Sequence, residues 1–122
     1  MRDIKFRQYY TGDDGSDPEW NYFDLRSGHM TIDGGYMDAQ QYTGLTDKNG
    51  VEIYEGDLIK DSYTIDPATI FEVVYHLGGF TVKNIDSKYA QPASNDYFRA
   101  FQDKCEVIGN IYENPELLKE NK

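Results

Sequence analysis

Two extended segments on either side of a glycine pair predict a β-hairpin in the second half of this chain. From Ile70 to Leu77, apolar and aromatic side chains alternate with polar ones, the pattern of a strand with one buried face. The pair Gly78-Gly79 follows at once and can supply the positive backbone dihedrals that a two-residue turn requires. A second extended segment begins at Phe80. We therefore expect an antiparallel hairpin that turns at the two glycines.

A similar alternation opens the chain. Residues Ile4 to Tyr10 predict a half-buried strand, with Ile4 and Phe6 on one face and Lys5 and Arg7 on the other. The next segment, GDDGSDPE, is rich in turn-forming residues, and the extended pattern resumes at WNYFDL. These two strands are expected to form a hairpin with a long loop.

The length of 122 residues fits one domain with a single core. Asp33, Gly34 and Gly35 interrupt the strand patterns, which places the best internal boundary near residues 33–40. We expect one unit, in which residues 1–38 form an N-terminal β-hairpin extension and residues 39–122 form the main module.

A strand and a short helix are predicted at the end of the chain. The strand spans Cys105 to Tyr112, and Gly109 within it indicates a bulge or a close approach of another backbone. Asn114 can cap a following helix, and Pro115 suits its first position. Leu117 and Leu118 could then dock on the sheet.

The segment from Gln40 to Ile59 contains two predicted turns. The first is Asp47-Lys-Asn-Gly50, where Asn49 and Gly50 tolerate positive dihedrals. The second is Gly56-Asp57, where the chain bends sharply into a strand. We expect the Asp57 carboxylate to accept backbone amide hydrogen bonds, with a role in ligand binding as the alternative.

Composition limits the classes of function. Eleven tyrosines, six phenylalanines and one tryptophan favour half-buried sheet surfaces. The net charge of -10 repels a phosphate backbone, so direct binding to nucleic acid is not expected. The single cysteine excludes an internal disulfide, and the first residues lack the apolar core of a secretory signal, which predicts a cytoplasmic protein. No apolar run approaches the roughly 18 residues of a membrane span.

Four segments resemble the YopX family, small proteins encoded by phages and prophages of bacteria. They are RDIKFR at Arg2–Arg7, QYTGLTDKNG ending at Gly50, IYEGDLI at Ile53–Ile59 and EVIGNIYENPELL at Glu106–Leu118. The resemblance implies a phage or prophage origin and hence a bacterial host cell. It implies a mainly β fold whose main module is a small SH3-like barrel. With the N-terminal β extension and the short C-terminal helix expected from the residues, this gives the predicted architecture. It implies no activity and no catalytic residues.

Sites for metals or catalysis are weakly indicated. The acidic loop with Asp13, Asp14, Asp17 and Glu19 could gather a hard cation, but its glycine and glutamate spacing does not fit an EF-hand. His29, His76 and Cys105 are too far apart in the sequence for a local zinc pattern. The chain contains neither a phosphate-binding GxxxxGK[ST] segment nor a GxSxG motif. We predict no catalytic residue, no metal and no cofactor.

Tyrosines on or beside the predicted strands offer a different kind of site. Tyr36, Tyr42, Tyr54, Tyr63 and Tyr75 could line an aromatic groove of the kind that SH3-like barrels use for peptides. The alternative is that these rings pack in the core and at its rim. The candidate binding residues are Tyr42, Tyr54, Asp57, Tyr63 and Tyr75.

The leading hypothesis is therefore a non-catalytic protein-interaction module that binds a host or phage protein, and that could form a homo-oligomer. One alternative is a small-molecule or metal-dependent enzyme that uses the acidic loop and His76. A second alternative is an acidic mimic of nucleic acid, which the net charge permits. An exposed aromatic patch or sheet edge would favour the binder, whereas carboxylates and histidine converging in a cleft would favour the enzyme.

Overall fold

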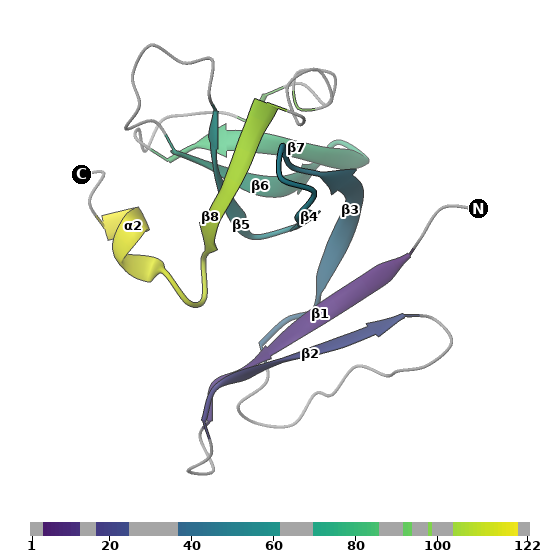
Figure 1. Cartoon of the computed structure of the whole chain (residues 1–122), viewed down its shortest axis with the longest axis vertical. Helices are drawn as coiled ribbons and strands as arrows, with labels where there is room; N and C mark the ends of the chain where they lie inside the picture. Colours follow the sequence, from purple (N-terminus) through teal and green to yellow (C-terminus); the bar gives the residue numbers. More distant parts are fainter. Residues whose placement is uncertain are drawn as a thin grey trace.

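Two antiparallel four-stranded sheets make up most of the protein, which confirms the mainly β prediction (Figure 1). The computed structural model describes residues 4–12, 17–24, 37–61, 70–85, 92–93, 98 and 104–119. The first sheet has the strand order β2-β1-β3-β4 and the second has the order β7-β6-β5-β8. The strands are β1 (Lys5–Tyr10), β2 (Glu19–Asp24), β3 (Gln40–Thr46), β4 (Glu52–Tyr54), β5 (Asp57–Asp61), β6 (Ile70–His76), β7 (Gly79–Asn84) and β8 (Cys105–Asn110), and helix α2 (Pro115–Lys119) follows them.

The first sheet begins with the hairpin expected near the N-terminus. Strands β1 and β2 pair along their whole length, from Lys5 opposite Asp24 to Tyr10 opposite Glu19. Strand β3 then pairs with β1 at its start, where Gln41 lies opposite Phe6, and with β4 further along. In Figure 1 the β1–β2 hairpin extends away from the second sheet, and β3 runs from one to the other.

The burial of β1 differs from the sequence prediction. Arg7 was expected on an outer face beside Lys5, but it is buried, and so is its neighbour Gln8. Alternation fails here because β1 is an inner strand and Arg7 faces β5, which begins fifty residues later in the chain. A charged side chain can be buried when an opposite charge and hydrogen-bond acceptors meet it there.

The β6–β7 hairpin is confirmed, but its turn lies one residue earlier than predicted. His76 pairs with Gly79, so the two turn residues are Leu77 and Gly78, with φ angles of 52° and 80°. This register places Val73 opposite Val82, and both are fully buried. A turn at Gly78-Gly79 would move Val82 opposite Tyr75, so core packing selects the register and leaves a leucine in a left-handed conformation.

The positive φ of Leu77 therefore lowers the stability of the fold, and its side chain is not buried in return. Its exposed fraction is 85%. We expect Leu77→Asn to raise the free energy of unfolding by about 0.5–1 kcal/mol, because asparagine tolerates positive φ and is favoured in such turns. Urea unfolding followed by circular dichroism measures the change. Leu77→Ala is the matched control, since alanine has the same steric penalty as leucine; equal stability of the two variants would refute the explanation.

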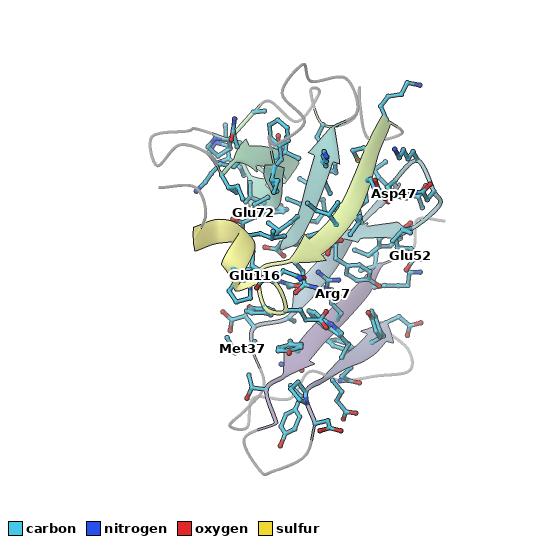
Figure 2. All side chains as sticks on the ribbon, turned by 60° about the vertical axis from the view of Figure 1, so that its left-hand side comes forward. Arg7, Met37, Asp47, Glu52, Glu72 and Glu116 are labelled. Atoms are coloured by element: carbon cyan, nitrogen blue, oxygen red, sulfur yellow. The ribbon has the colours of Figure 1, made fainter. Side chains whose placement is uncertain are left out.

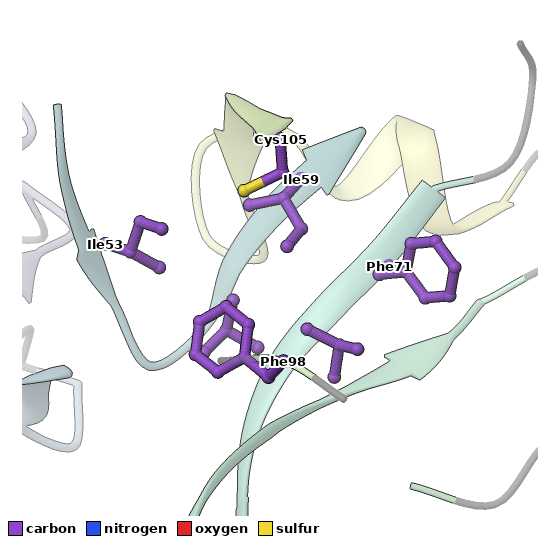
Figure 3. Packing of buried hydrophobic residues seen from close by; sticks show 7 residues of the cluster. Ile53, Ile59, Phe71, Phe98 and Cys105 are labelled. Carbon is purple, nitrogen blue, oxygen red and sulfur yellow. The ribbon is translucent and has the colours of Figure 1, made fainter. Parts of the chain in front are cut away.

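Most of the core lies in the second sheet, to which the first sheet adds Ile53 and a segment outside both sheets adds Phe98. The core consists of Ile53, Ile59, Phe71, Val73, Val82, Phe98 and Cys105 (Figure 3). Ile53 comes from β4, so this strand packs with the second sheet. Two backbone hydrogen bonds also join the sheets: Gly56 N–H donates to the Val73 oxygen at 2.8 Å and Lys48 N–H to the Cys105 oxygen at 3.0 Å. Within the described ranges, the strands form two separate sheets and not one closed barrel.

The end of the chain has the predicted strand and helix, but the strand ends at Asn110 and not at Tyr112. Strand β8 has a register irregularity opposite Leu58 and Ile59, and a Cβ atom on Gly109 would lie 2.5 Å from the Asn114 side-chain oxygen. The expected bulge is therefore present, whereas the group that approaches Gly109 closely is a side chain and not another backbone. Helix α2 begins at Pro115 as predicted, but the Asn114 side-chain oxygen accepts the Asn110 N–H at 3.1 Å and so turns back toward β8.

Candidate functional site

A buried ion pair lies where the two sheets meet, and Arg7 of β1 is its centre (Figure 2). Arg7 Nη2 is 2.6 Å from Asp57 Oδ1, and Arg7 Nε donates a hydrogen bond to Gln40 Oε1 at 2.8 Å. The side chains of Arg7 and Asp57 are only 7% and 2% exposed. The second oxygen of Asp57 accepts the Tyr54 N–H at 2.7 Å, which confirms the backbone hydrogen bond predicted for this carboxylate.

Aromatic rings complete the surroundings of Arg7. Its guanidinium carbon lies 4.3 Å from the centre of the Trp20 ring and 4.7 Å from that of the Tyr54 ring. Such contacts with ring faces stabilise a desolvated cation. The contacts of Arg7 therefore connect β1 with β2, β3, β4 and the start of β5, and local periodicity gave no signal for them.

Burial controls the ionisation of this site. Burial raises the pKa of Asp57, whereas the Arg7 guanidinium and the Tyr54 amide stabilise the carboxylate and lower it. Burial also raises the pKa of Tyr54 to about 12, and the nearby Glu52 carboxylate adds to this shift. Tyr54 is therefore a neutral phenol at physiological pH, and the Asp57 oxygens are engaged by protein donors.

A second contact joins the N-terminal hairpin to the end of the chain. Trp20 Nε1 donates to Glu113 Oε1 at 2.7 Å, and Asn110 Nδ2 donates to the same oxygen at 2.9 Å. The rings of Tyr9 and Tyr112 stack beside it with centres 5.7 Å apart. These residues were not singled out from the sequence, because partners more than 90 positions apart leave no local pattern.

The Glu113 contact should weaken in acid. Hydrogen bonds from Asn110 and Trp20 lower the pKa of Glu113, so the stability they provide is present above the ordinary glutamate pKa and lost as the pH falls through the lowered value. Trp20 is the only tryptophan, so its fluorescence reports this step directly. We expect its emission to shift to longer wavelength with a midpoint below the ordinary glutamate range. Glu113→Gln should abolish that transition; an unchanged acid titration in the variant would exclude Glu113 as its source.

The structure separates the candidate binding residues into two places. Tyr42 and Tyr54 are buried, with ring centres 5.5 Å apart, and both lie near the Arg7–Asp57 pair. Tyr75 lies in the second sheet. The centre of its ring is 5.3 Å from that of Phe80 in a T-shaped arrangement, and Tyr75 is 56% exposed. Tyr63 falls outside the described residues, as does Tyr36.

The groups considered for metal binding or catalysis are also dispersed. Asp13, Asp14 and His29 lie outside the described residues, and Asp17 and Glu19 are exposed. Cys105 is fully buried in the core, and His76 ends β6. Within the part of the chain that the structure describes, no three His, Cys, Asp or Glu residues are grouped as a metal would require.

The surface around Tyr75 is hollowed on two sides. One hollow, of about 270 Å³, includes Asp38, Glu55 and Glu72 among its lining residues. The other, of about 460 Å³, includes Leu45 and Phe80. A third hollow of about 350 Å³ lies beside the Arg7–Asp57 pair and Tyr22, whose exposed fraction is 59%.

No helix in the described ranges has the length and apolar character needed to cross a lipid bilayer.

Comparison with known proteins gives two findings. The model of the family described as "YopX protein" matches residues 5–119. The crystal structure of protein EF1440 from Enterococcus faecalis is similar, with a TM-score of 0.55 and 27% sequence identity over 94% of this chain and 97% of that one. No curated protein matches the chain.

Proposed function

Since the chain belongs to the YopX family, we propose that it is a phage- or prophage-encoded protein that acts in the bacterial cytoplasm as a non-catalytic protein-interaction module. The proposed partner is a host or phage protein. A second copy of the chain is the alternative partner, which would make the protein a homo-oligomer.

The observation that carries this proposal is the tip of the β6–β7 hairpin. Leu77 is 85% exposed and has a φ of 52°, so it gains little from burial and costs backbone energy. Tyr75, two residues earlier, exposes 56% of its surface beside Phe80. Exposed apolar side chains at a strained turn are typical of a contact surface, and tyrosine is enriched in such surfaces.

The proposal includes an SH3-like arrangement for residues 39–122. Two features support it: Ile53 of β4 packs in the core of the second sheet, and the backbone bonds from Gly56 to Val73 and from Lys48 to Cys105 bring β3 and β4 against β5 to β8. In this arrangement the β6–β7 hairpin would present its tip at one end of the module.

Affinity capture from infected or lysogenic bacterial cells tests the proposed function. We expect the tagged wild-type protein to recover a specific protein and Tyr75→Thr to recover much less of it. Tyr22→Thr is the matched control, because Tyr22 is 59% exposed on another strand and receives the same substitution. Recovery of no specific protein, or equal recovery by all three proteins, would contradict the proposal.

A further inference from the structure

The larger hollow beside Tyr75 is a groove between β3 and the β6–β7 hairpin. Its lining is mixed, because the polar residues Gln41 and Thr43 stand beside apolar and aromatic side chains. We call it the hairpin groove and define it by Leu45, Tyr75, Phe80 and Phe98 with the backbone of Gly44 and Gly78. Its volume is about 460 Å³. Leu77 does not line the groove, but it is exposed at the turn of the same hairpin, two residues after Tyr75.

The smaller hollow shares Tyr75 with the groove but is lined by carboxylates. We call it the acidic hollow and define it by Asp38, Glu55, Glu72, Tyr75 and Tyr112. These carboxylates come from three separate segments, the approach to β3, the turn before β5 and strand β6, and the Glu72 label in Figure 2 marks the β6 side. The hollow has a volume of about 270 Å³. Its carboxylates favour a cationic side chain, and the rings of Tyr75 and Tyr112 lie beside it.

Burial and neighbouring charges of both signs act on the groups that line the acidic hollow. Burial raises the pKa of Glu72, Lys83 lowers it and Glu55 raises it again. Burial also raises the pKa of Tyr112, the carboxylates of Asp38 and Glu55 raise it further, and the Arg7 guanidinium lowers it. A cation bound between these groups would stabilise their ionised forms.

We propose that the hairpin groove binds an extended peptide segment that places an apolar side chain against Leu45 and Phe80 and a nearby lysine or arginine in the acidic hollow. Tyr75 separates the two positions and contacts both side chains. The inference rests on the proposed function and names the chemistry of its partner. Charge complementarity commits it to a basic segment, because the acidic hollow adjoins the groove and the whole chain has a net charge of -10.

Selection from a random peptide library with the purified full-length protein tests the inference. We expect the enriched peptides to combine a basic residue with an aromatic or aliphatic one a few positions away. A fluorescein-labelled enriched peptide is then titrated by fluorescence anisotropy. Binding should weaken at higher salt, because screening reduces the attraction between exposed charges.

Two variants and one control locate the binding. Tyr75→Thr and the double change Glu55→Gln with Glu72→Gln should each raise the Kd about tenfold, which corresponds to the loss of about 1.4 kcal/mol. Tyr22→Thr should leave the Kd within about twofold of the wild type, since exposed substitutions outside a contact have small effects. Trp20 fluorescence and thermal unfolding verify that each variant is folded.

Enriched peptides without basic residues, or a Kd that is unchanged in both variants, would overturn the inference. A selection that enriches no peptide would also count against it. The capture experiment distinguishes this failure from a failure of the proposed function. If a protein is captured from cells through Tyr75 but the peptide selection fails, the proposed function is supported and only the basic peptide is rejected.

Discussion

Replacement of Arg7 by methionine is expected to lower the free energy of unfolding by about 3–5 kcal/mol. The change leaves the Asp57 carboxylate buried without its cation and removes the donor to Gln40 Oε1. Methionine fills a similar volume, so the loss would reflect the missing charge and hydrogen bonds more than a cavity. A domain of this size has only about 5–15 kcal/mol of stability, so the effect is large. Urea unfolding followed by Trp20 fluorescence and circular dichroism measures it.

A double-mutant cycle separates the ion pair from the other contacts of its members. Asp57→Asn should also destabilise the protein strongly, because Arg7 is then buried without a counter-charge. The double variant should be less destabilised than the sum of the two single changes by about 1–3 kcal/mol, since neither charge is then left alone. Strict additivity, or a cost below about 1 kcal/mol for Arg7→Met, would show that the pair does not connect the sheets as described.

Asp47→Ala is expected to cost about 2–4 kcal/mol, the second largest effect. One carboxylate oxygen of this buried residue accepts the N–H groups of Asn49 and Val51, at 2.8 and 2.9 Å. The other oxygen accepts the Val107 N–H of β8 at 2.9 Å. The substitution removes both acceptor oxygens and all three hydrogen bonds, which loosens the turn and its attachment to β8.

Asp47→Asn tests the two parts of this role separately. An asparagine can still accept the two turn amides through its oxygen, but its amide group cannot accept the Val107 N–H. We therefore expect an intermediate loss of stability, together with faster amide hydrogen exchange in β8 and little change in the turn. Equal losses for Asp47→Asn and Asp47→Ala would place all of the effect at the Val107 contact, whereas wild-type stability for either variant would contradict the assignment.

The sequence predicted those features that short-range chemistry controls. Alternation identified β1 and β6, and the turn Asp47–Gly50 was predicted from the tolerance of Asn49 and Gly50 for positive φ. In the structure Gly50 has a φ of 81°. The beginning of α2 at Pro115 follows from the same kind of local preference. In each case the residues that determine the structure are neighbours in the chain.

Features that depend on distant partners were not accessible in this way. Arg7 was placed on an outer face because its partner Asp57 lies fifty residues away. The hairpin turn was displaced by one residue because the burial of Val73 against Val82 outweighs the preference of glycine for positive φ. The exposure of Tyr75, in contrast to the burial of Tyr42 and Tyr54, likewise depends on how the two sheets meet.

Photo-crosslinking in bacterial cells tests the proposed interaction surface most directly. A photoreactive phenylalanine analogue replaces Tyr75 in one protein and the equally exposed Tyr22 in another, and the adducts are separated after irradiation. If the β6–β7 hairpin contacts the partner, the protein labelled at position 75 forms a discrete adduct with another protein and the protein labelled at position 22 does not. No adduct at position 75, or the same adducts from both positions, would contradict the account.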